Sequence, residues 1–333
     1  MRAIVFEKFG EPEDVLAIRD VDMPNPAAGE VRVRMLAAPV NPSDLLSVRG
    51  QYARLPELPA TPGFEGVGIV ESAGPGLYGK LLVGKRVAAL NSTTGSWAEF
   101  AIVTAKQAVP LPRRLPLEQA AMFFVNPATA FILTRKLLAV PAGEWLLQTA
   151  AGSALGRMVI RLGRRFGFKT INVVRRTEQV AELKALGADV VIVHEGGDLR
   201  KQVIEATCGT GVRYAIDPVG GATGSAVVSC LAAGARLLLY GTLSGAPVAI
   251  SPRDLIALSA TIEGFWLGTW MARQNLVGKI TLMRTLTALI EEGVLASDVE
   301  ETYPLERIGE AVCAAEKVGR AGKVLLKIDA TAS

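Results

Sequence analysis

The spacing of apolar positions divides the 333-residue chain into three segments with different patterns. From Met1 to about Leu117, short apolar or β-branched runs are separated by glycine and proline, which is typical of strands joined by turns. This segment predicts a β-rich domain with strands near residues 3–6, 31–40, 66–72, 86–90 and 97–103.

The middle segment, from about Glu118 to Gly264, alternates between strands and helices. Trp145–Thr149 and Thr170–Val174 are continuous apolar or β-branched runs, as expected for strands buried on both faces of a sheet. The residues between them, Ser153–Phe166, have helical periodicity. Further strand-like runs continue the series at 190–193, 214–216 and 235–240. The alternation predicts an α/β fold with a parallel, doubly wound sheet.

The last segment begins at about Leu267 and contains two helix-like stretches, 280–291 and 306–318, before a final strand at 323–328. We expect this tail to pack back on the first domain. The resulting division gives a first domain of residues 1–118 completed by 270–333, and a second domain of residues 119–269.

Composition narrows the functional classes. Half of the residues are hydrophobic, which supports a large core and excludes a disordered chain. The net charge of +4, from 36 basic and 32 acidic residues, is too small to indicate nucleic-acid binding. Three scattered cysteines and one histidine argue against a zinc cluster, a disulfide framework and most histidine-based catalysis. Neither a signal peptide nor a spanning apolar run is visible, so we expect a cytoplasmic protein with no membrane partner.

The strongest chemical signal is the stretch Gln148–Gly156, which follows a predicted strand and opens a predicted helix. Its small residues allow backbone N–H groups to approach a pyrophosphate, and the helix N-terminus adds partial positive charge. The stretch departs from G-x-G-x-x-G, and a tight turn without a ligand is the alternative.

Two arginines, Arg175 and Arg176, follow the next strand. A site that prefers NAD would place an acidic residue there, whereas two arginines favour a 2′-phosphate. NADPH is therefore the expected cofactor, and a solvated strand end is the alternative.

The three segments together resemble the medium-chain dehydrogenase/reductase superfamily over essentially the whole chain. The resemblance implies a GroES-like catalytic domain followed by a Rossmann-type domain. Zinc alcohol dehydrogenases of this superfamily carry Cys and His ligands in two stretches that read Asn41–Asp44 and Gly63–Glu65 in this chain. Because the chain lacks the ligands that zinc requires, we expect a reductase with no metal.

More specific matches resemble the NADPH-dependent trans-2-enoyl-thioester reductases. The most specific are Gly50-Gln51-Tyr52 and Gly264-Phe265-Trp266-Leu267, and Val40–Asp44, Val125-Asn126-Pro127 and Val219-Gly220-Gly221 accompany them. The resemblance implies hydride transfer from the nicotinamide to Cβ of an enoyl thioester. Cα then needs a proton, and a phenol that stays protonated at neutral pH makes Tyr52 a suitable donor. The alternative is a loop tyrosine that packs its ring at the domain edge.

The resemblance also implies a set of cofactor contacts. The pyrophosphate would be held by Gly152, Ser153, Ala154 and Leu155, and the 2′-phosphate by Arg175, Arg176 and Thr177. The nicotinamide side would be lined by Asn126, Tyr240, Gly241, Thr242, Leu243, Phe265, Trp266 and Leu267, and the adenosine phosphate would be reached by Lys323. Candidates for an acyl pocket, each also compatible with a core position, are Trp97, Phe123, Phe124, Trp266 and Trp270.

Two other functions remain in view. A zinc-independent NADPH:quinone oxidoreductase would need the same cofactor site, with stacking of a flat quinone in place of a proton-donating tyrosine. A cofactor-binding protein with a structural or RNA-binding role is disfavoured by the modest charge and the lack of an aromatic and basic surface motif. The resemblance implies a homodimer that acts on a small-molecule substrate.

Overall fold

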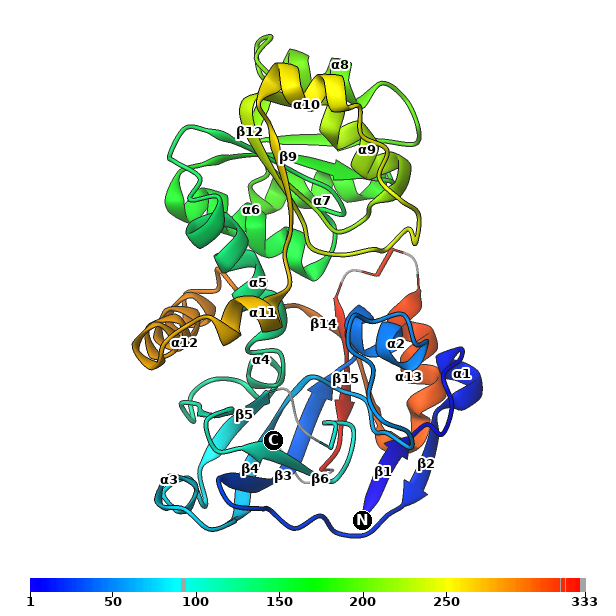
Figure 1. Ribbon diagram of the computed structural model, residues 1–333, viewed down its shortest axis with the longest axis vertical. Helices are drawn as coiled ribbons and strands as arrows, with labels where there is room; N and C mark the ends of the chain where they lie inside the picture. Colours follow the sequence, from blue (N-terminus) through cyan, green and yellow to red (C-terminus); the bar gives the residue numbers. More distant parts are fainter. Residues whose placement is uncertain (91–93, 318, 321, 330–333) are drawn as a thin grey trace. The chain divides into compact units, whose positions relative to one another are not determined.

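The computed structural model describes residues 1–90, 94–317, 319–320 and 322–329, which form two compact units (Figure 1). Unit 1 comprises Met1–Val125 and Ser297–Ser333, and unit 2 comprises Asn126–Ala296. The division therefore lies later in the chain than the sequence pattern placed it, since residues 119–125 belong to unit 1 and residues 270–296 to unit 2.

Unit 1 is the β-rich part of the chain. Its strands are β1 (Arg2–Val5), β2 (Ala17–Asp20), β3 (Glu30–Pro39), β4 (Glu65–Ala73), β5 (Arg86–Leu90), β6 (Phe100–Thr104), β7 (Ala108–Pro110), β14 (Val299–Pro304) and β15 (Lys323–Lys327). Its helices are α1 (Pro12–Val15), α2 (Pro42–Val48), α3 (Leu77–Lys80), α4 (Leu117–Ala121), the 3₁₀ turn η2 (Leu305–Arg307) and α13 (Ile308–Glu316). The predicted strands are confirmed to within a few residues, whereas β2, β7 and β14 were not predicted.

Strands from both ends of the chain share the main sheet of unit 1. Among the described residues its order is β14-β15-β3-β4-β5-β7, and β6 pairs with β3. β15 runs antiparallel to β3, with Leu326 opposite Ala38. Both side chains are fully buried in the core, together with Val33 and Val87. The expected return of the tail to the first domain is therefore confirmed from Ser297 onward.

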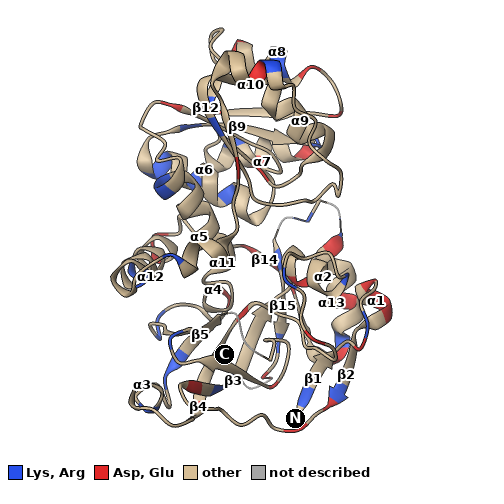
Figure 2. Cartoon of the chain, in the orientation of Figure 1, with Lys and Arg blue, Asp and Glu red and all other residues tan. Residues whose placement is uncertain are grey.

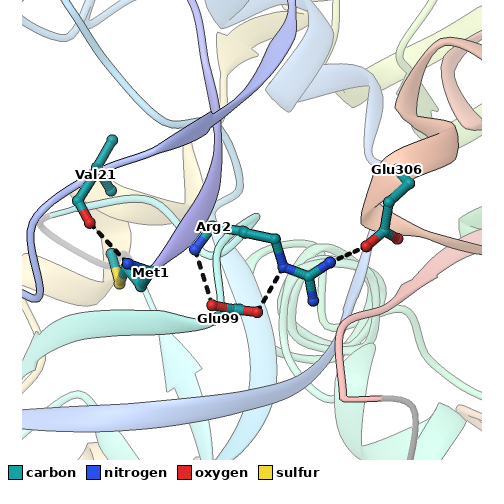
Figure 3. Close-up of polar contacts among 5 residues, drawn as sticks. All are labelled: Met1, Arg2, Val21, Glu99 and Glu306. Atoms are coloured by element: carbon teal, nitrogen blue, oxygen red, sulfur yellow. Dashed lines mark hydrogen bonds and ion pairs between the residues drawn. The ribbon is translucent and has the colours of Figure 1, made fainter.

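A second tie between the ends of the chain is made by Arg2 (Figure 3). Its backbone N–H and its Nε each donate to the Glu99 carboxylate at 2.8 Å, and its guanidinium also pairs with Glu306. Met1 donates its terminal ammonium to the carbonyl of Val21 at 2.8 Å, which fixes the start of β1 beside the end of β2.

Unit 2 is built on a parallel sheet. Its strands are β8 (Trp145–Gln148), β9 (Lys169–Val174), β10 (Val190–Val193), β11 (Val212–Asp217), β12 (Leu231–Leu239) and β13 (Thr261–Gly264). Its helices are α5 (Val125–Phe131), the π-helical η1 (Ile132–Leu137), α6 (Ala154–Phe166), α7 (Glu178–Leu186), α8 (Leu199–Ala206), α9 (Gly221–Ser229), α10 (Pro252–Leu258), α11 (Leu267–Ala272) and α12 (Leu276–Glu291).

The order β10-β9-β8-β11-β12-β13, with parallel pairing throughout, confirms the predicted doubly wound sheet in the described chain. From β8 the chain adds β9 and β10 on one side, and then crosses back to add β11, β12 and β13 on the other side of β8. Leu146 and Leu147 of β8 are fully buried, as expected for a central strand covered on both faces. Because all strands run the same way, their carboxyl ends meet at one edge of the sheet, where ligands of such folds bind.

Helix α6 starts and stops where its sequence predicts. Ser153 is the N-cap and its hydroxyl accepts a hydrogen bond from the Gly156 N–H at 3.1 Å. Gly167 ends the helix in the left-handed region, at φ 80°, and its N–H donates to the carbonyl of Gly163 at 2.7 Å. Met158, Val159, Ile160 and Leu162 are fully buried between these ends.

Helix α12 belongs to unit 2 because α6 holds the chain that follows it. Arg165 pairs with Glu292 at 3.0 Å, and Nη1 of Arg161 donates to the carbonyl of Ala296 at 2.7 Å. Periodicity in the sequence finds such a helix but does not show which partner it packs against. In the part of the chain that the structure describes, no helix has both the length and the apolar composition to cross a membrane.

The close packing of Gly156 against Ala151 at the start of α6 predicts an effect of substitution on stability. A Cβ at Gly156 would lie 2.5 Å from the carbonyl oxygen of Ala151, whereas a Cβ at Gly309 in α13 would meet no atom within 4 Å. We expect Gly156→Ala to destabilise the protein by about 1–3 kcal/mol through overpacking. The control Gly309→Ala should be neutral or slightly stabilising, since alanine favours helix. Calorimetric unfolding measures both, and a Gly156→Ala protein as stable as the wild type would contradict the close contact.

Candidate active site

The turn between β8 and α6 is built to receive an anion. Ala151 and Gly152 are buried, and the close contact of Gly156 with Ala151 places the start of α6 directly against the end of the strand. The N–H groups of Ala154 and Leu155 belong to the first helical turn, where no intrahelical acceptor exists. Unpaired N–H groups and the helix dipole together favour a phosphate at this position.

The predicted arginines lie at the same edge of the sheet. β8 and β9 are parallel neighbours with Gln148 opposite Asn172, so Arg175 and Arg176 follow the carboxyl end of the adjacent strand. Arg175 is exposed and Arg176 is half-buried, and neither has an ion-pair partner among the described residues. Thr177 follows them as the N-cap of α7. The structure thus brings the predicted pyrophosphate and 2′-phosphate residues to one edge of unit 2.

The residues expected on the nicotinamide side come from the neighbouring strands. Tyr240 and Phe265 follow the carboxyl ends of β12 and β13, and the Phe265 N–H donates to Leu239 at 2.8 Å. They lie at the edge that also carries the β8–α6 turn, since β12 joins β8 through β11. The hydroxyl of Tyr240 is buried without a partner in the described residues, and its pKa is raised by burial and by the nearby Asp217. The remaining predicted residues of these two loops are Gly241, Thr242, Leu243, Trp266 and Leu267.

These features of unit 2 fit a phosphorylated dinucleotide. The β8–α6 turn offers the N–H groups of a first helical turn, the end of β9 offers two arginines that form no ion pair within the described residues, and the buried hydroxyl of Tyr240 has no hydrogen-bond partner among them. Asn126, also expected near the nicotinamide, is the first residue of unit 2 and is half-buried. The individual contacts of all these residues with a cofactor remain predictions.

Tyr52 lies in unit 1, shortly after α2. It is half-buried, and its ring centroid lies 5.0 Å from that of Phe64 with 36° between the ring planes. The chain before it is fixed by Gly50 at φ 73° and by the Gln51 N–H, which donates to Leu46 at 2.9 Å. These two backbone features therefore fix the turn that carries the phenol.

A buried polar network lies beside this turn. Asn41, Asp44, Glu65 and Lys323 are each no more than 3% exposed. The Lys323 ammonium donates to the Val40 carbonyl at 3.3 Å and to Oδ1 of Asn41. The role expected for Lys323, at the adenosine phosphate, would require these bonds to break, and that role remains a prediction.

Both carboxyl groups of the network are fully engaged. Asp44 accepts hydrogen bonds from the N–H groups of Asn41, at 2.8 Å, and Phe64, at 3.0 Å. Glu65 accepts from Nδ2 of Asn41 at 3.0 Å and from the N–H groups of Phe124 and Val125 at 3.0 and 2.9 Å.

Burial perturbs all three ionisable groups of the network. Loss of hydration raises the pKa of Asp44 to about 7 and raises the pKa of Glu65, because the charged form of each is disfavoured. The same cause lowers the pKa of Lys323 to about 8, with a further contribution from the nearby Arg320. In the sequence, Asn41–Asp44 and Gly63–Glu65 were noted as stretches without zinc ligands, and no role in a buried network was predicted for them. The Asn-x-x-Asp spacing of a capping box was the available signal.

The network does not fit a zinc ion. Every carboxylate oxygen of Asp44 and Glu65 already accepts an N–H, and Oδ1 of Asn41 accepts the Lys323 ammonium. A cation here would displace these donors and would lie close to a buried positive charge. Within the residues that the structure describes, no group of three or more His, Cys, Asp and Glu side chains is arranged to bind a metal.

Two other sets of residues do not add to the site. Trp97, Phe123 and Phe124 are at most 4% exposed, and Nε1 of Trp97 donates to Pro39 at 3.1 Å, so they are core residues of unit 1. An open hollow of about 790 Å³ lies beside α13, and Figure 2 shows acidic residues along α1 and α13. Its lining includes the carboxylates of Glu13, Glu301, Glu310 and Glu316, which would repel a phosphorylated ligand.

The chain matches two family models. Residues 27–113 match the alcohol dehydrogenase GroES-like domain, and residues 154–281 match the zinc-binding dehydrogenase domain. These matches confirm the predicted fold class of a GroES-like domain and a Rossmann-type domain. The second family is named for zinc, although the network of unit 1 does not accommodate that metal.

Known proteins resemble the chain over nearly its full length. It is 35% identical over 321 residues to the mitochondrial enoyl-[acyl-carrier-protein] reductase of Xenopus tropicalis, covering 93% of this chain and 91% of that protein. The human protein of the same name is 32% identical over 98% of this chain and 88% of its own. The crystal structure of Escherichia coli quinone oxidoreductase complexed with NADPH superposes with a TM-score of 0.91 at 28% identity, covering 98% of this chain and 100% of the other.

The raised pKa of Asp44 predicts a pH dependence of stability. The folded protein holds this proton at pH values where the unfolded chain, with a pKa of 3.8, has lost it. Its stabilising effect is therefore complete below about pH 4 and is lost as the pH rises through about 7. We expect the stability of the wild type relative to Asp44→Asn to fall between pH 5 and 7, by on the order of 1 kcal/mol per pH unit.

Urea unfolding at pH 5, 6 and 7 measures this difference. Asp20→Asn is a suitable control, because Asp20 is exposed at the end of β2. A stability difference between wild type and Asp44→Asn that is constant or grows with pH would refute the assignment.

Proposed function

Because this chain belongs to the medium-chain dehydrogenase/reductase family that includes enoyl reductases and quinone oxidoreductases, we propose that it reduces the C2=C3 double bond of trans-2-enoyl thioesters with NADPH. The thioester is carried by CoA or by an acyl carrier protein. Sequence identity over nearly the full chain with proteins named enoyl reductase supports this substrate class. The chemistry of the two units supports the separate roles described below, cofactor binding in unit 2 and proton donation in unit 1.

Unit 2 binds the cofactor in this proposal. Gly152, Ser153, Ala154 and Leu155 hold the pyrophosphate through backbone N–H groups at the start of α6. Arg175 and Arg176, with Thr177, bind the 2′-phosphate that distinguishes NADPH from NADH. Asn126, the loop 240–243 and the loop 265–267 would line the nicotinamide, and Lys323 stays a candidate contact of the adenosine phosphate.

Unit 1 supplies the proton. Bound NADPH would supply a hydride to Cβ of the substrate, which would leave the thioester as an enolate. Tyr52 donates its phenolic proton to Cα and is reprotonated from solvent, so no metal is needed to complete the reduction. The observation that carries this assignment is that each oxygen of the buried carboxylates of unit 1 accepts an N–H donor, while a phenol is held in the adjoining turn.

A second candidate function is NADPH:quinone oxidoreduction. The similarity to the quinone oxidoreductase of Escherichia coli favours it, since the cofactor site would be the same. The two functions differ in their need for a proton donor at Cα. As the resemblance implies, we also propose that the protein is a homodimer.

Replacement of the proposed acid tests the reaction. Tyr52→Phe keeps the ring but removes the proton, so kcat with crotonyl-CoA and NADPH should fall by about 10²-fold or more. Tyr78→Phe is the matched control, because Tyr78 is an exposed tyrosine of α3 in the same unit. Both variants are assayed by NADPH oxidation with crotonyl-CoA and with a quinone. Wild-type protein that reduces quinones but not crotonyl-CoA would transfer the assignment to the second candidate.

Replacement of the two arginines tests the choice of cofactor. In Arg175→Ala/Arg176→Ala, the Kd for NADPH should rise by at least about tenfold, because two charged donors to the 2′-phosphate are lost. The Kd for NADH should change little. Arg213→Ala is the control, since Arg213 is exposed at the opposite end of the parallel sheet, near the start of β11. Calorimetric titration gives the four constants, and equal losses for both cofactors would remove the 2′-phosphate role.

A further inference from the structure

The buried carboxyl group of Asp44 has no part in the reaction proposed above, yet it contacts both segments that hold Tyr52. One of its oxygens accepts the Asn41 N–H and closes the capping box that starts α2. The other accepts the N–H of Phe64. Asp44 therefore joins a helix start to a residue 20 positions further along the chain.

The contact of Asp44 with the start of α2 affects the phenol, because Tyr52 follows α2 closely in the chain. Leu45 and Val48 of α2 are buried at 3% and 0% exposure, which fixes the helix against the core of unit 1. After α2, the N–H of Gly50 donates to Ser47 at 3.1 Å and that of Gln51 to Leu46 at 2.9 Å. The residue next to Gln51 is Tyr52, so the direction of α2 sets the place where the phenol begins.

The other side limits the orientation of the ring. Phe64 presents its ring to Tyr52 at a centroid distance of 5.0 Å, and its backbone is the part that Asp44 holds. Aromatic pairs at this separation have preferred geometries, so the Phe64 ring restricts the orientation of the Tyr52 ring. The Asp44 carboxylate thus holds the backbone that carries the ring packed on Tyr52.

Other charged groups keep this carboxyl group in place. Asp44 interacts electrostatically with Lys323 of β15 and Glu65 of β4, and Lys323 also interacts with Arg320. Lys323 holds Asn41 through Oδ1, and Glu65 holds the same residue through Nδ2. Asn41 is therefore fixed from three directions, and Asp44 cannot shift without breaking the network.

We infer that Asp44 is a positioning residue for Tyr52, holding the α2 turn and the Phe64 ring so that the phenol is presented to the substrate. The inference rests on the proposed function for its catalytic meaning, while the positioning itself can be observed without turnover.

The experiment uses the full chain with ¹³C-labelled tyrosine rings, of which the sequence has five. The Tyr52 signal is assigned by its loss in Tyr52→Phe. In Asp44→Asn, an amide NH₂ group replaces one of the two acceptor oxygens, so one of the two hydrogen bonds is lost. The Tyr52 signal should then shift while those of the other four tyrosines stay in place. Phe64→Leu should shift the same signal, and the exposed control Asp20→Asn should leave all five unchanged. A Tyr52 signal that does not move in Asp44→Asn would overturn the inference.

A measurement on wild-type protein does not depend on the variant folding. Because burial raises the pKa of Asp44 to about 7, the Tyr52 signal should move between pH 5.5 and 8.5 with a midpoint near that value. Glu65, Lys323 and Arg320 are the charged groups that face the network in this range. A Tyr52 signal that is constant over the range would also overturn the inference.

Kinetics then link position to catalysis. For crotonyl-CoA, kcat of Asp44→Asn should fall by about 10- to 100-fold with the Kd for NADPH unchanged, as expected for a misplaced group. In the Tyr52→Phe background the same substitution should cause no further loss, because its effect passes through the phenol. Equal losses in both backgrounds would show a purely structural role. If wild-type protein does not reduce enoyl thioesters but the Tyr52 signal still responds, the proposed function fails and the positioning stands.

Discussion

Two carboxyl groups and one ammonium group are buried together in unit 1, and this pairing constrains the rest of the unit. Buried charges are costly unless they are paired and hydrogen-bonded. Asp44, Glu65 and Lys323 come from α2, β4 and β15, which are far apart in the sequence, and each is hydrogen-bonded to Asn41. The two carboxyl groups accept donors from within the first 125 residues, whereas the ammonium that Oδ1 of Asn41 accepts comes from the last strand. The returning tail therefore completes the network where β15 pairs with β3.

The network also shows why this part of the fold does not fit a zinc ion. Its carboxylates are occupied by backbone and amide N–H groups, so they serve as structural anchors for α2, Phe64 and the Phe124–Val125 segment. In the proposed reaction, the proton comes from the phenol in the adjoining turn. In unit 2, the proposed cofactor site consists of ordinary features of a parallel sheet: strands of one direction, a helix N-terminus and two arginines at one edge. Under this proposal, proton donation and cofactor binding depend on different structural features of the two units.

Much of this organisation could be predicted from local patterns. The apolar runs of β8 and β9, the Ser153 cap and the Gly167 stop determine α6 and its turn within a few residues, so the position of the proposed nucleotide-binding turn could be predicted. The edge strands β2, β7 and β14 were missed because short, partly exposed strands carry little periodic signal. The placement of α12 was missed because its partners, Arg161 and Arg165, are far away in sequence. The burial of Lys323 was equally hidden, since a lysine is usually exposed and its partner Asn41 is distant.

In the proposed reaction, the protein delivers a hydride to Cβ and a solvent-derived proton to Cα of an enoyl thioester. The fate of deuterium in butyryl-CoA formed from crotonyl-CoA tests both transfers. With NADPH deuterated at the transferred position of C4, we expect one deuterium at C3 of the product and none at C2. With unlabelled NADPH in D₂O, we expect one deuterium at C2. Product that carries the cofactor deuterium at C2, or no butyryl-CoA at all, would refute the proposed reaction.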